Sequence, residues 1–306
     1  MDTDFKSWPL LEDYAKRFPL KYFRGAENSN SLFYYDCNPD TVSGKPILVL
    51  VHGLGDEADT WRHIIPVLGK AGYRVLAPDL PGFGRSIVAG SSNIKKHCKA
   101  VLELIESVSG GAVLIGSSLG AAITESIILS GHLRERIKAL ILLDGCIPIK
   151  SPASPSLLIS ALPFMGKKWY RSFRNDPDKA WQSLIPYYAD IEKLNEEDRI
   201  FLRKRVMNRV CSVTQERAYF STLRSLIFHS LRTSYYRRIG SWPGRIKLIW
   251  GEKDMILPAN LAESFIELRG NNADKLSVIS GAGHLPHQEK PAETAKVILD
   301  FLETLS

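Results

Sequence analysis

The stretch that decides the fold is VLIGSSLGAAI, residues 113–123. A run of branched apolar residues, typical of a buried strand, ends in GSSLG, and a segment of small and apolar residues follows. This Gly-x-Ser-x-Gly spacing is typical of a sharp turn from a strand into a helix. A Cβ atom at Gly116 or Gly120 would collide with the neighbouring strand and helix, so we expect the glycines to make the bend and the bend to present the hydroxyl of Ser118.

Short apolar runs alternate with longer amphipathic ones along most of the chain. Together with 112–118, strands are predicted at 31–36, 46–53, 73–79, 137–145, 245–254 and 275–284. Helices are predicted at about 60–70, 92–108, 119–131, 258–269 and 291–305. Several strands are apolar on both faces, as in a sheet that helices cover on both sides. The pattern therefore predicts an α/β fold with a mostly parallel sheet flanked by helices.

The alternation stops between residues 147 and 243, where no run resembles a strand. A segment of this length is too long for a structureless loop in a compact domain. We therefore expect a helical cap (lid) subdomain at 147–243, inserted into a core domain made of residues 1–146 and 244–306. This segment is called the insertion below.

The net charge of +7 is concentrated in the insertion, which holds 17 Lys and Arg against 8 Asp and Glu. These basic residues are scattered among aromatic ones and form no nucleic-acid-binding motif, so we expect no nucleic-acid partner. Charges at helical spacing usually face water. The alternative is that they attract an anionic substrate or an acidic surface.

No segment predicts insertion into a membrane or secretion. The longest apolar runs fall well short of the ~18 residues that a membrane span needs, and the amino end MDTDFKSWPL has neither a basic leader nor an apolar core. The four cysteines are scattered, fit no metal spacing and are too few for a disulfide framework. A cytoplasmic protein without a stable membrane anchor is expected.

Chemically competent residues close three of the predicted strands. In an open parallel sheet, ligands collect at the carboxyl ends of the strands. Ser118 is a candidate nucleophile there, His284 its base, and Asp254 the acid that orients the base, in the chain order Ser, Asp, His. His287 is the competing base and Asp144 the competing acid. Taken alone, the serine motif could be only a tight turn, and an Asp or a His at a strand end is usually a helix cap or a surface residue. The prediction depends on all three residues lying at strand ends in the expected chain order.

An acyl-transfer site also needs donors for the oxyanion. We expect these to be the backbone N–H of Leu119, directly after the serine, and that of Leu54, in the loop that follows the strand 46–53. His52 is interpreted as a structural residue that braces this loop. Such chemistry requires no metal and no organic cofactor.

Five motifs now identify a family: HGLGD (52–56), DLPGFGRS (79–86), GSSLG (116–120), GEKD (251–254) and GAGHLPHQEKP (281–291). Together they resemble the α/β-hydrolase superfamily from about residue 31 to the carboxyl end, except through the insertion. The resemblance implies an eight-stranded, mostly parallel sheet with the insertion as a helical cap over the active site. It also supports Ser118 as nucleophile, Asp254 as acid and His284 as base.

Departures from the residue patterns of known subfamilies reduce the number of candidate activities. Epoxide hydrolases and haloalkane dehalogenases of this fold carry Asp where Ser118 stands. Carbon–carbon bond hydrolases tend to carry Asn and Trp where this chain has Ser117 and Leu285, and proline iminopeptidases usually carry Trp where it has Leu119. The broad esterase and lipase group remains.

The favoured function is therefore hydrolysis of a small-molecule carboxylic ester, by a monomer or a homodimer. The alternatives are carbon–carbon bond cleavage of an anionic ring-cleavage product and a ligand-binding receptor with little turnover. Specificity is expected in the insertion, whose apolar stretch 154–166 and aromatic residues could form an acyl pocket; these are Trp169, Tyr170, Trp181, Tyr187 and Tyr188. The alternative is that these aromatic side chains form the core of the insertion itself.

Overall fold

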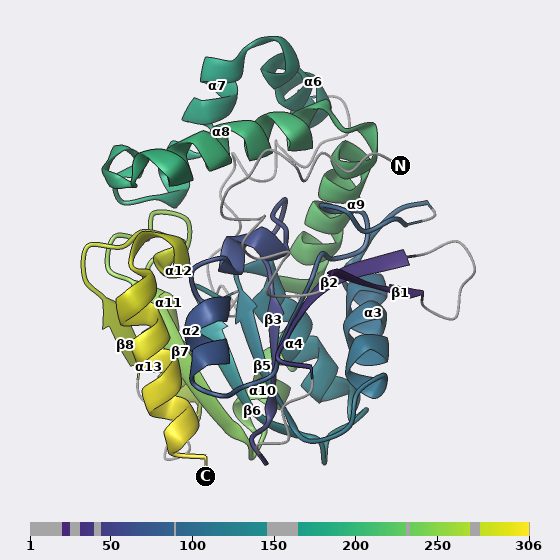
Figure 1. Cartoon of the computed structure of the whole chain (residues 1–306), viewed down its shortest axis with the longest axis vertical. Coiled ribbons are helices and arrows are strands. Elements are labelled where there is room, and N and C mark those ends of the chain that lie inside the picture. Colours follow the sequence, from purple (N-terminus) through teal and green to yellow (C-terminus); the bar gives the residue numbers. More distant parts are fainter. Residues whose placement is uncertain are drawn as a thin grey trace.

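An eight-stranded sheet forms the centre of the computed structural model, which describes residues 20–24, 31–39, 44–88, 90–145, 165–230, 233–269 and 276–305 (Figure 1). The strands are β1 (Leu20–Arg24), β2 (Ser31–Cys37), β3 (Ile47–Val51), β4 (Val75–Pro78), β5 (Ala112–Ser117), β6 (Ile137–Leu143), β7 (Arg245–Gly251) and β8 (Leu276–Ile279). Their order in the sheet is β1-β2-β4-β3-β5-β6-β7-β8. Only the β1–β2 and β2–β4 pairs are antiparallel. The predicted eight-stranded, mostly parallel sheet is confirmed.

Two strands are shorter than their apolar pattern predicted, which places two candidate residues in loops. β7 stops at Gly251 and β8 at Ile279, so Asp254 and His284 lie beyond the sheet edge. The chain turns at Gly281, whose φ is +69°, and the two loops bond to each other, since Lys253 N–H donates to the carbonyl of Ala282 at 2.8 Å. Turn geometry therefore overrides the apolar pattern at both ends.

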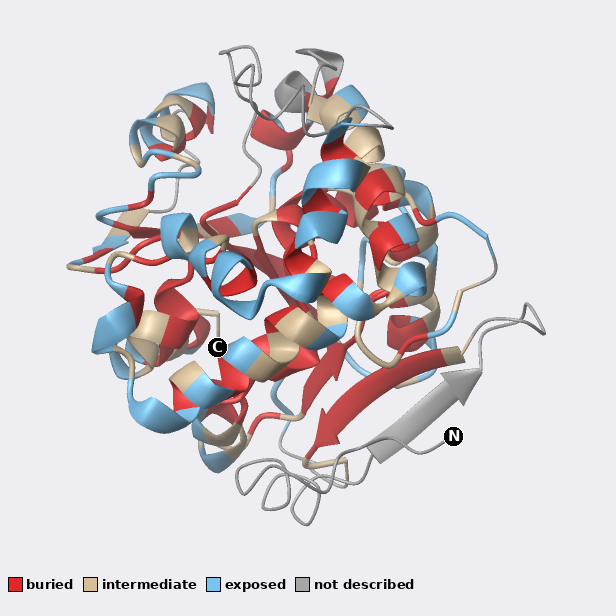
Figure 2. Cartoon of the chain, turned by 90° about the horizontal axis from the view of Figure 1, so that it is seen from above, coloured by how far each residue is buried: buried red, intermediate tan, exposed pale blue. Residues whose placement is uncertain are grey.

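Helices cover both faces of the sheet, and successive residues of a strand serve opposite faces. In β3, Val49 and Val51 pack into one core and Leu48 and Leu50 into the other, all fully buried. The first core contains residues of α3 (Ile94–Glu106), α4 (Leu119–Ser130), α10 (Thr233–Gly240) and α11 (Asn260–Arg269); the second contains residues of α2 (Ile65–Lys70) and α13 (Pro291–Glu303). Figure 2 shows the buried strands surrounded by helices with exposed outer surfaces.

The described part of the insertion is helical and has a core of its own. Its elements are α6 (Met165–Ser172), η3 (Phe173–Asn175), α7 (Pro177–Gln182), η4 (Ile185–Tyr187), η5 (Ile191–Lys193), α8 (Glu196–Cys211), α9 (Val213–Ser230) and α10. Figure 1 shows α6, α7 and α8 beyond one end of the sheet. Helix α10 instead packs against α4 and α11, and Ile239 lies in a core of the sheet. The division into core and cap at residue 243 stays a prediction.

The predicted helix 60–70 is interrupted. A 3-10 turn, η2 (Ala58–Trp61), comes first, and α2 begins only at Ile65, followed directly by Pro66 in its first turn. Proline is favoured at this position of a helix, because its missing N–H would have no partner there. Within the described residues, no helix is both long and apolar enough to span a bilayer.

Candidate active site

The turn between β5 and α4 has the geometry that its glycines predict. Ser118 adopts φ +52° and ψ −113°, a conformation that L-residues rarely take. A Cβ atom on Gly116 would lie 2.5 Å from the backbone of Gly120, and one on Gly120 would overlap the carbonyl of Val51. Strand and helix therefore meet so closely that only glycine fits at both positions, and Ser118 is left half-buried at the sheet edge.

The loop after β3 runs beside this serine. A Cβ atom built on Gly53 would lie 3.4 Å from Cβ of Ser118, so the neighbouring Leu54 lies close to the turn that carries Ser118. Leu119 is the first residue of α4, where backbone N–H groups have no carbonyl of the preceding helical turn to bond. These positions suit donors to an oxyanion, and the roles of Leu54 and Leu119 stay predictions.

A buried pair forms where the loops after β7 and β8 meet. His284 Nδ1 lies 2.8 Å from Oδ2 of Asp254, and both side chains are almost fully buried. The other oxygen, Oδ1 of Asp254, accepts the backbone N–H groups of Ile256 and Leu257 at 2.8 and 2.9 Å. Because a carboxylate can only accept, a neutral His284 ring bonded in this way carries its proton on Nδ1 and keeps a lone pair on Nε2.

That lone pair is not in use. Among the described residues, Nε2 of His284 is buried without a hydrogen-bond partner, so no hydrogen bond joins it to Oγ of Ser118 here. Hydrogen bonds between a nucleophile and its base are often formed fully only with substrate bound. The action of Ser118 and His284 as one unit stays a prediction.

The competing acid, Asp144, lies in the same cluster as Asp254. One ligand-type atom from each of Asp144, Asp254 and His284 falls within 4.8 Å of the others. Asp144 has φ +41°, and its Oδ1 accepts the N–H of Gly251 at 2.8 Å. Burial and the neighbouring Asp254 carboxylate raise the pKa of Asp144 well above its usual range. The sequence favoured Asp254 over Asp144, and in the structure the hydrogen bond of His284 goes to Asp254.

The cluster of Asp144, Asp254 and His284 also has the number of protein ligands that a catalytic zinc ion takes. However, His284 and Asp254 already bond each other directly, and two backbone donors occupy the second oxygen of Asp254. This donor pattern fits an acid–base pair better than a metal site.

The two other histidines considered from the sequence are engaged elsewhere. His287 stacks on Trp61 and bonds Oγ1 of Thr60 through Nε2, and burial lowers its pKa to about 3. His52 accepts the N–H of Leu80 at Nε2 and lies 2.8 Å from the carbonyl of Gly53 through Nδ1. Both rings are fully buried, and His52 connects the backbone of Gly53 to that of Leu80.

The insertion contacts the histidine loop directly. The N–H of His284 donates to the carbonyl of Tyr187 at 2.9 Å, and the Tyr187 ring lies 5.9 Å from the His284 ring. Of the five aromatic residues expected around an acyl pocket, Tyr170, Trp181 and Tyr188 pack in the core of the insertion and Trp169 is half exposed. Tyr187 packs against the same core and also contacts the candidate base. Most of the apolar stretch, 154–164, lies outside the described residues.

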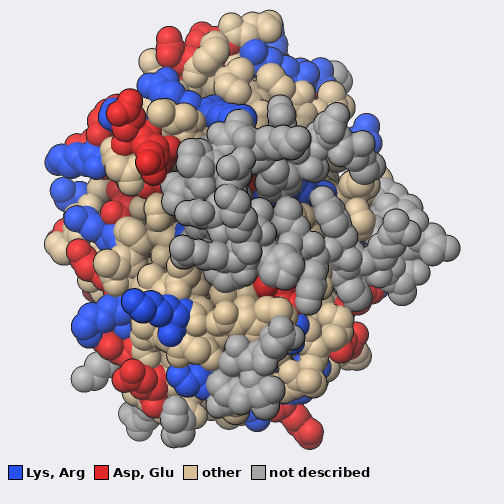
Figure 3. Space-filling model, in the orientation of Figure 1, with Lys and Arg blue, Asp and Glu red and all other residues tan. Residues whose placement is uncertain are grey.

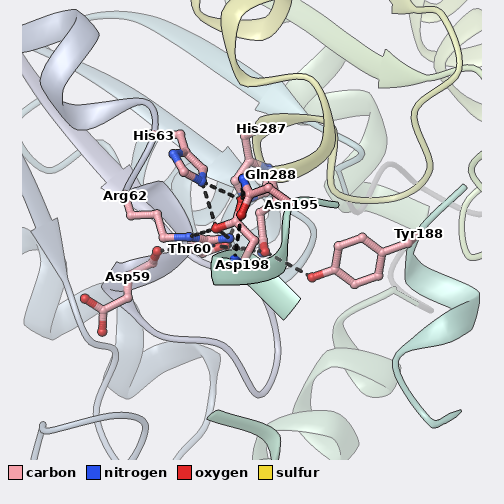
Figure 4. A network of polar contacts seen from close by, with 9 residues as sticks. All are labelled: Asp59, Thr60, Arg62, His63, Tyr188, Asn195, Asp198, His287 and Gln288. Carbon is pink, nitrogen blue, oxygen red and sulfur yellow. Dashed lines mark hydrogen bonds and ion pairs between the residues drawn. The ribbon is translucent and has the colours of Figure 1, made fainter. Parts of the chain in front are cut away.

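A polar network that the sequence did not predict joins the insertion to the sheet domain (Figure 4). Asp198 of α8 receives hydrogen bonds from Arg62 at 2.7 Å and His63 at 2.9 Å. The network continues through the residues next to the candidate base and comprises Asp59, Thr60, Arg62, His63, Tyr188, Asn195, Asp198, His287 and Gln288. In the sequence, the local sign of this network is that Asn195 and Asp198 are three residues apart. In the structure, the side chain of Asn195 accepts the N–H of Asp198 and caps the start of α8.

The basic residues of the insertion do not all face water. Figure 3 shows Lys and Arg side chains on its visible surface with acidic side chains nearby. Arg171 and Arg174 both bond Glu216, while Arg205 is largely buried and pairs with Asp56 at 2.8 Å. One basic residue of the insertion therefore pairs with an acid in the loop that carries Leu54.

Comparisons with known proteins identify the family of this chain. A model described as the alpha/beta hydrolase family matches residues 48–297, so the chain belongs to that family. The 2-hydroxy-6-oxononadienedioate/2-hydroxy-6-oxononatrienedioate hydrolase of Burkholderia vietnamiensis (strain G4 / LMG 22486) is 26% identical over 300 residues, which cover 92% of this chain and 95% of that protein.

Solved structures show the same fold. A thermophilic esterase from Thermogutta terrifontis matches with a TM-score of 0.72 at 21% identity, covering 94% of this chain and 98% of the esterase. The serine hydrolase CCSP0084 from Cycloclasticus zankles also has a TM-score of 0.72, at 19% identity, with 94% and 98% coverage. The chain is thus an alpha/beta hydrolase, and the similar proteins named here are a 2-hydroxy-6-oxononadienedioate/2-hydroxy-6-oxononatrienedioate hydrolase, an esterase and a serine hydrolase.

Proposed function

We propose that this protein is a serine hydrolase that cleaves carboxylic esters through an acyl-enzyme. The observation that carries the proposal is the His284–Asp254 pair, in which Nδ1 bonds the carboxylate and the buried Nε2 keeps an unused lone pair. A base in this state is what a serine nucleophile requires. The strained Ser118, on the same edge of the sheet, is the nucleophile.

In the proposed reaction, Oγ of Ser118 attacks the ester carbonyl while Nε2 of His284 takes the hydroxyl proton. The N–H groups of Leu54 and Leu119 stabilise the tetrahedral oxyanion. The C–O bond to the alcohol then breaks, and His284 returns the proton to the departing alkoxide. Water repeats both steps on the acyl-enzyme and releases the acid and the free serine. The insertion serves as a cap that supplies specificity.

The test is labelling by a fluorophosphonate probe, which phosphonylates an activated serine. The wild-type protein should be labelled, and Ser118→Ala should not. Ser117→Ala, which changes the neighbouring buried serine, is the matched control and should retain labelling. A folded wild-type protein that takes no label would favour the receptor alternative and contradict the proposal.

Carbon–carbon bond cleavage is the second candidate, because the similar protein of B. vietnamiensis is a hydrolase of a dienedioate and the insertion is basic. It predicts that a charged dienone acid is turned over faster than neutral aryl esters. A panel of aryl esters with graded acyl lengths, run beside one such acid, separates the two reactions.

A further inference from the structure

Two arginines of α8 reach the loop that follows β3. Arg205 and Arg209 are four residues apart and therefore lie on one face of the helix. Arg205 Nη2 lies 2.8 Å from Oδ1 of Asp56, and Arg209 Nη1 donates to the carbonyl of Gly55 at 3.1 Å. Helix α8 thus places two guanidinium groups against the loop that carries Leu54.

The two arginines differ in how their charge is balanced. Asp56 neutralises Arg205: burial alone would raise the pKa of Asp56, but Arg205, His52 and the N–H of Glu57 together outweigh burial and lower it. Arg209 forms no ion pair with any residue that the structure describes. Its Nε–H is also buried and, within the same residues, has no hydrogen-bond partner. A buried donor of a charged group costs free energy unless something binds it.

The surroundings of Arg209 supply further donors. A Cβ atom built on Gly55 would lie 3.2 Å from Nη1 of Arg209 and 3.1 Å from the Tyr219 ring, so the three groups are adjacent. Burial raises the pKa of Tyr219 and of Tyr187, and the positive charge of Arg209 acts on both in the opposite direction. Both phenols are therefore neutral hydroxyl donors near a cation.

The guanidinium of Arg209 lies within reach of Ser118, the candidate nucleophile. Gly53 lies beside Ser118, and Gly55, two residues further on, lies beside Arg209. Two residues of backbone span at most about 7 Å. Tyr187 contacts the candidate base from the side of the insertion, with its ring 5.9 Å from that of His284. A short chain held on Ser118 could therefore extend to the guanidinium.

We infer that Arg209, with Tyr187 and Tyr219, forms a subsite for the carboxylate at the far end of the substrate's acyl chain. The inference rests on the proposed function and narrows its substrate to half-esters of short dicarboxylic acids. A carboxylate fits because a single unneutralised guanidinium offers one compensating charge and adjacent N–H donors that can bind both oxygens. Arg209 is a specificity-determining residue and takes no part in bond making or breaking.

The test compares two p-nitrophenyl esters of equal acyl length, one ending in a carboxylate (the glutarate half-ester) and one neutral (the valerate ester). The ratio of their kcat/KM values, charged over neutral, should exceed one in the wild-type protein. Arg209→Gln should lower this ratio at least tenfold through the KM of the charged ester, and Arg209→Lys should restore part of it. Arg203→Gln, on the exposed side of the same helix, is the matched control and should leave the ratio unchanged.

A binding measurement covers the case in which no ester is turned over. Free glutarate should bind Ser118→Ala in a calorimetric titration, and the double variant Ser118→Ala/Arg209→Gln should bind it at least tenfold more weakly. An unchanged kcat/KM ratio in Arg209→Gln, or equal glutarate affinity in the two titrated proteins, would overturn the subsite. If the wild-type protein took no fluorophosphonate label while Ser118→Ala still bound glutarate through Arg209, only the proposed hydrolysis would be overturned.

Discussion

Two carboxyl groups lie beside His284, and their hydrogen bonds give them different tasks. Asp254 accepts bonds from His284 Nδ1 and from two backbone N–H groups, so all of its described partners are donors. Asp144 is fully buried and accepts one backbone N–H, with its pKa held high by burial and by the charge of Asp254. We interpret Asp254 as the group that orients the histidine and Asp144 as a neutral neighbour of it.

Replacing each acid by its amide separates these tasks. Asp254→Asn should lower kcat about a thousandfold, because an amide can donate to Nδ1 and favours the wrong tautomer of His284. Asp144→Asn keeps an acceptor for the N–H of Gly251 and removes no charge, so its kcat should fall less than about tenfold. Steady-state kinetics on a hydrolysed aryl ester measures both. A larger loss in Asp144→Asn than in Asp254→Asn would make Asp144 the orienting acid.

At the scale of elements, local spacing predicted the strand-turn-helix at Ser118 because its cause is local. A Cβ atom on Gly116 would meet the backbone of Gly120, only four residues further along the chain, while Gly120 is itself crowded by the carbonyl of Val51 at the end of β3. The chain order favoured Asp254 over Asp144, but the sequence could not show that both acids lie in one cluster, because this depends on how the loops after β6 and β7 place side chains across the sheet edge. The Arg62–Asp198 pair was also not accessible, since 136 residues separate its partners.

The junction between α8 and the sheet domain depends on Asp198. Arg62 and Asp198 are both nearly fully buried, so Asp198→Asn leaves a buried cation without its counter-ion and should cost about 3 kcal/mol of stability. Although burial alone would raise it, hydrogen bonds and charge from His63 and Arg62 lower the pKa of Asp198 to about 2. Its stabilisation is therefore present above the usual pKa of 3.8 and lost as pH falls toward 2.

Urea unfolding at pH 7 and at pH 3 checks this. The difference between the wild-type protein and Asp198→Asn should be large at pH 7 and smaller at pH 3. Asp178→Asn, an exposed acid of the insertion, is the matched control and should change little at either pH. Equal destabilisation by Asp198→Asn at both values would show that the carboxylate charge does not hold this junction.

Across the whole molecule, buried ionisable groups limit stability from both sides of the pH range. Burial raises the pKa of Glu57 and of Glu125 to about 8, so their stabilising protonated forms are lost as pH rises from about 4.5 through 8. Burial lowers the pKa of His97 and of His287 to about 3, so the neutral rings favour the fold above 6.5 and this contribution is lost as pH falls toward 3. We therefore expect greatest stability near pH 6.

Glu125 gives the clearest test of the expected loss of stability as pH rises. It is fully buried on α4, with Tyr235 donating to Oε2 at 3.0 Å and with Oε1 lacking a partner among the described residues. Glu125→Gln keeps the shape and cannot ionise, so the variant should retain up to about 3 kcal/mol that the wild-type protein loses between pH 5 and pH 8. Thermal unfolding across this range measures the slope, with the exposed Glu135→Gln as matched control. If Glu125→Gln and the wild-type protein lost stability in parallel, Glu125 would ionise in the folded protein without cost. The protonated Glu125 side chain expected in the fold would then be wrong.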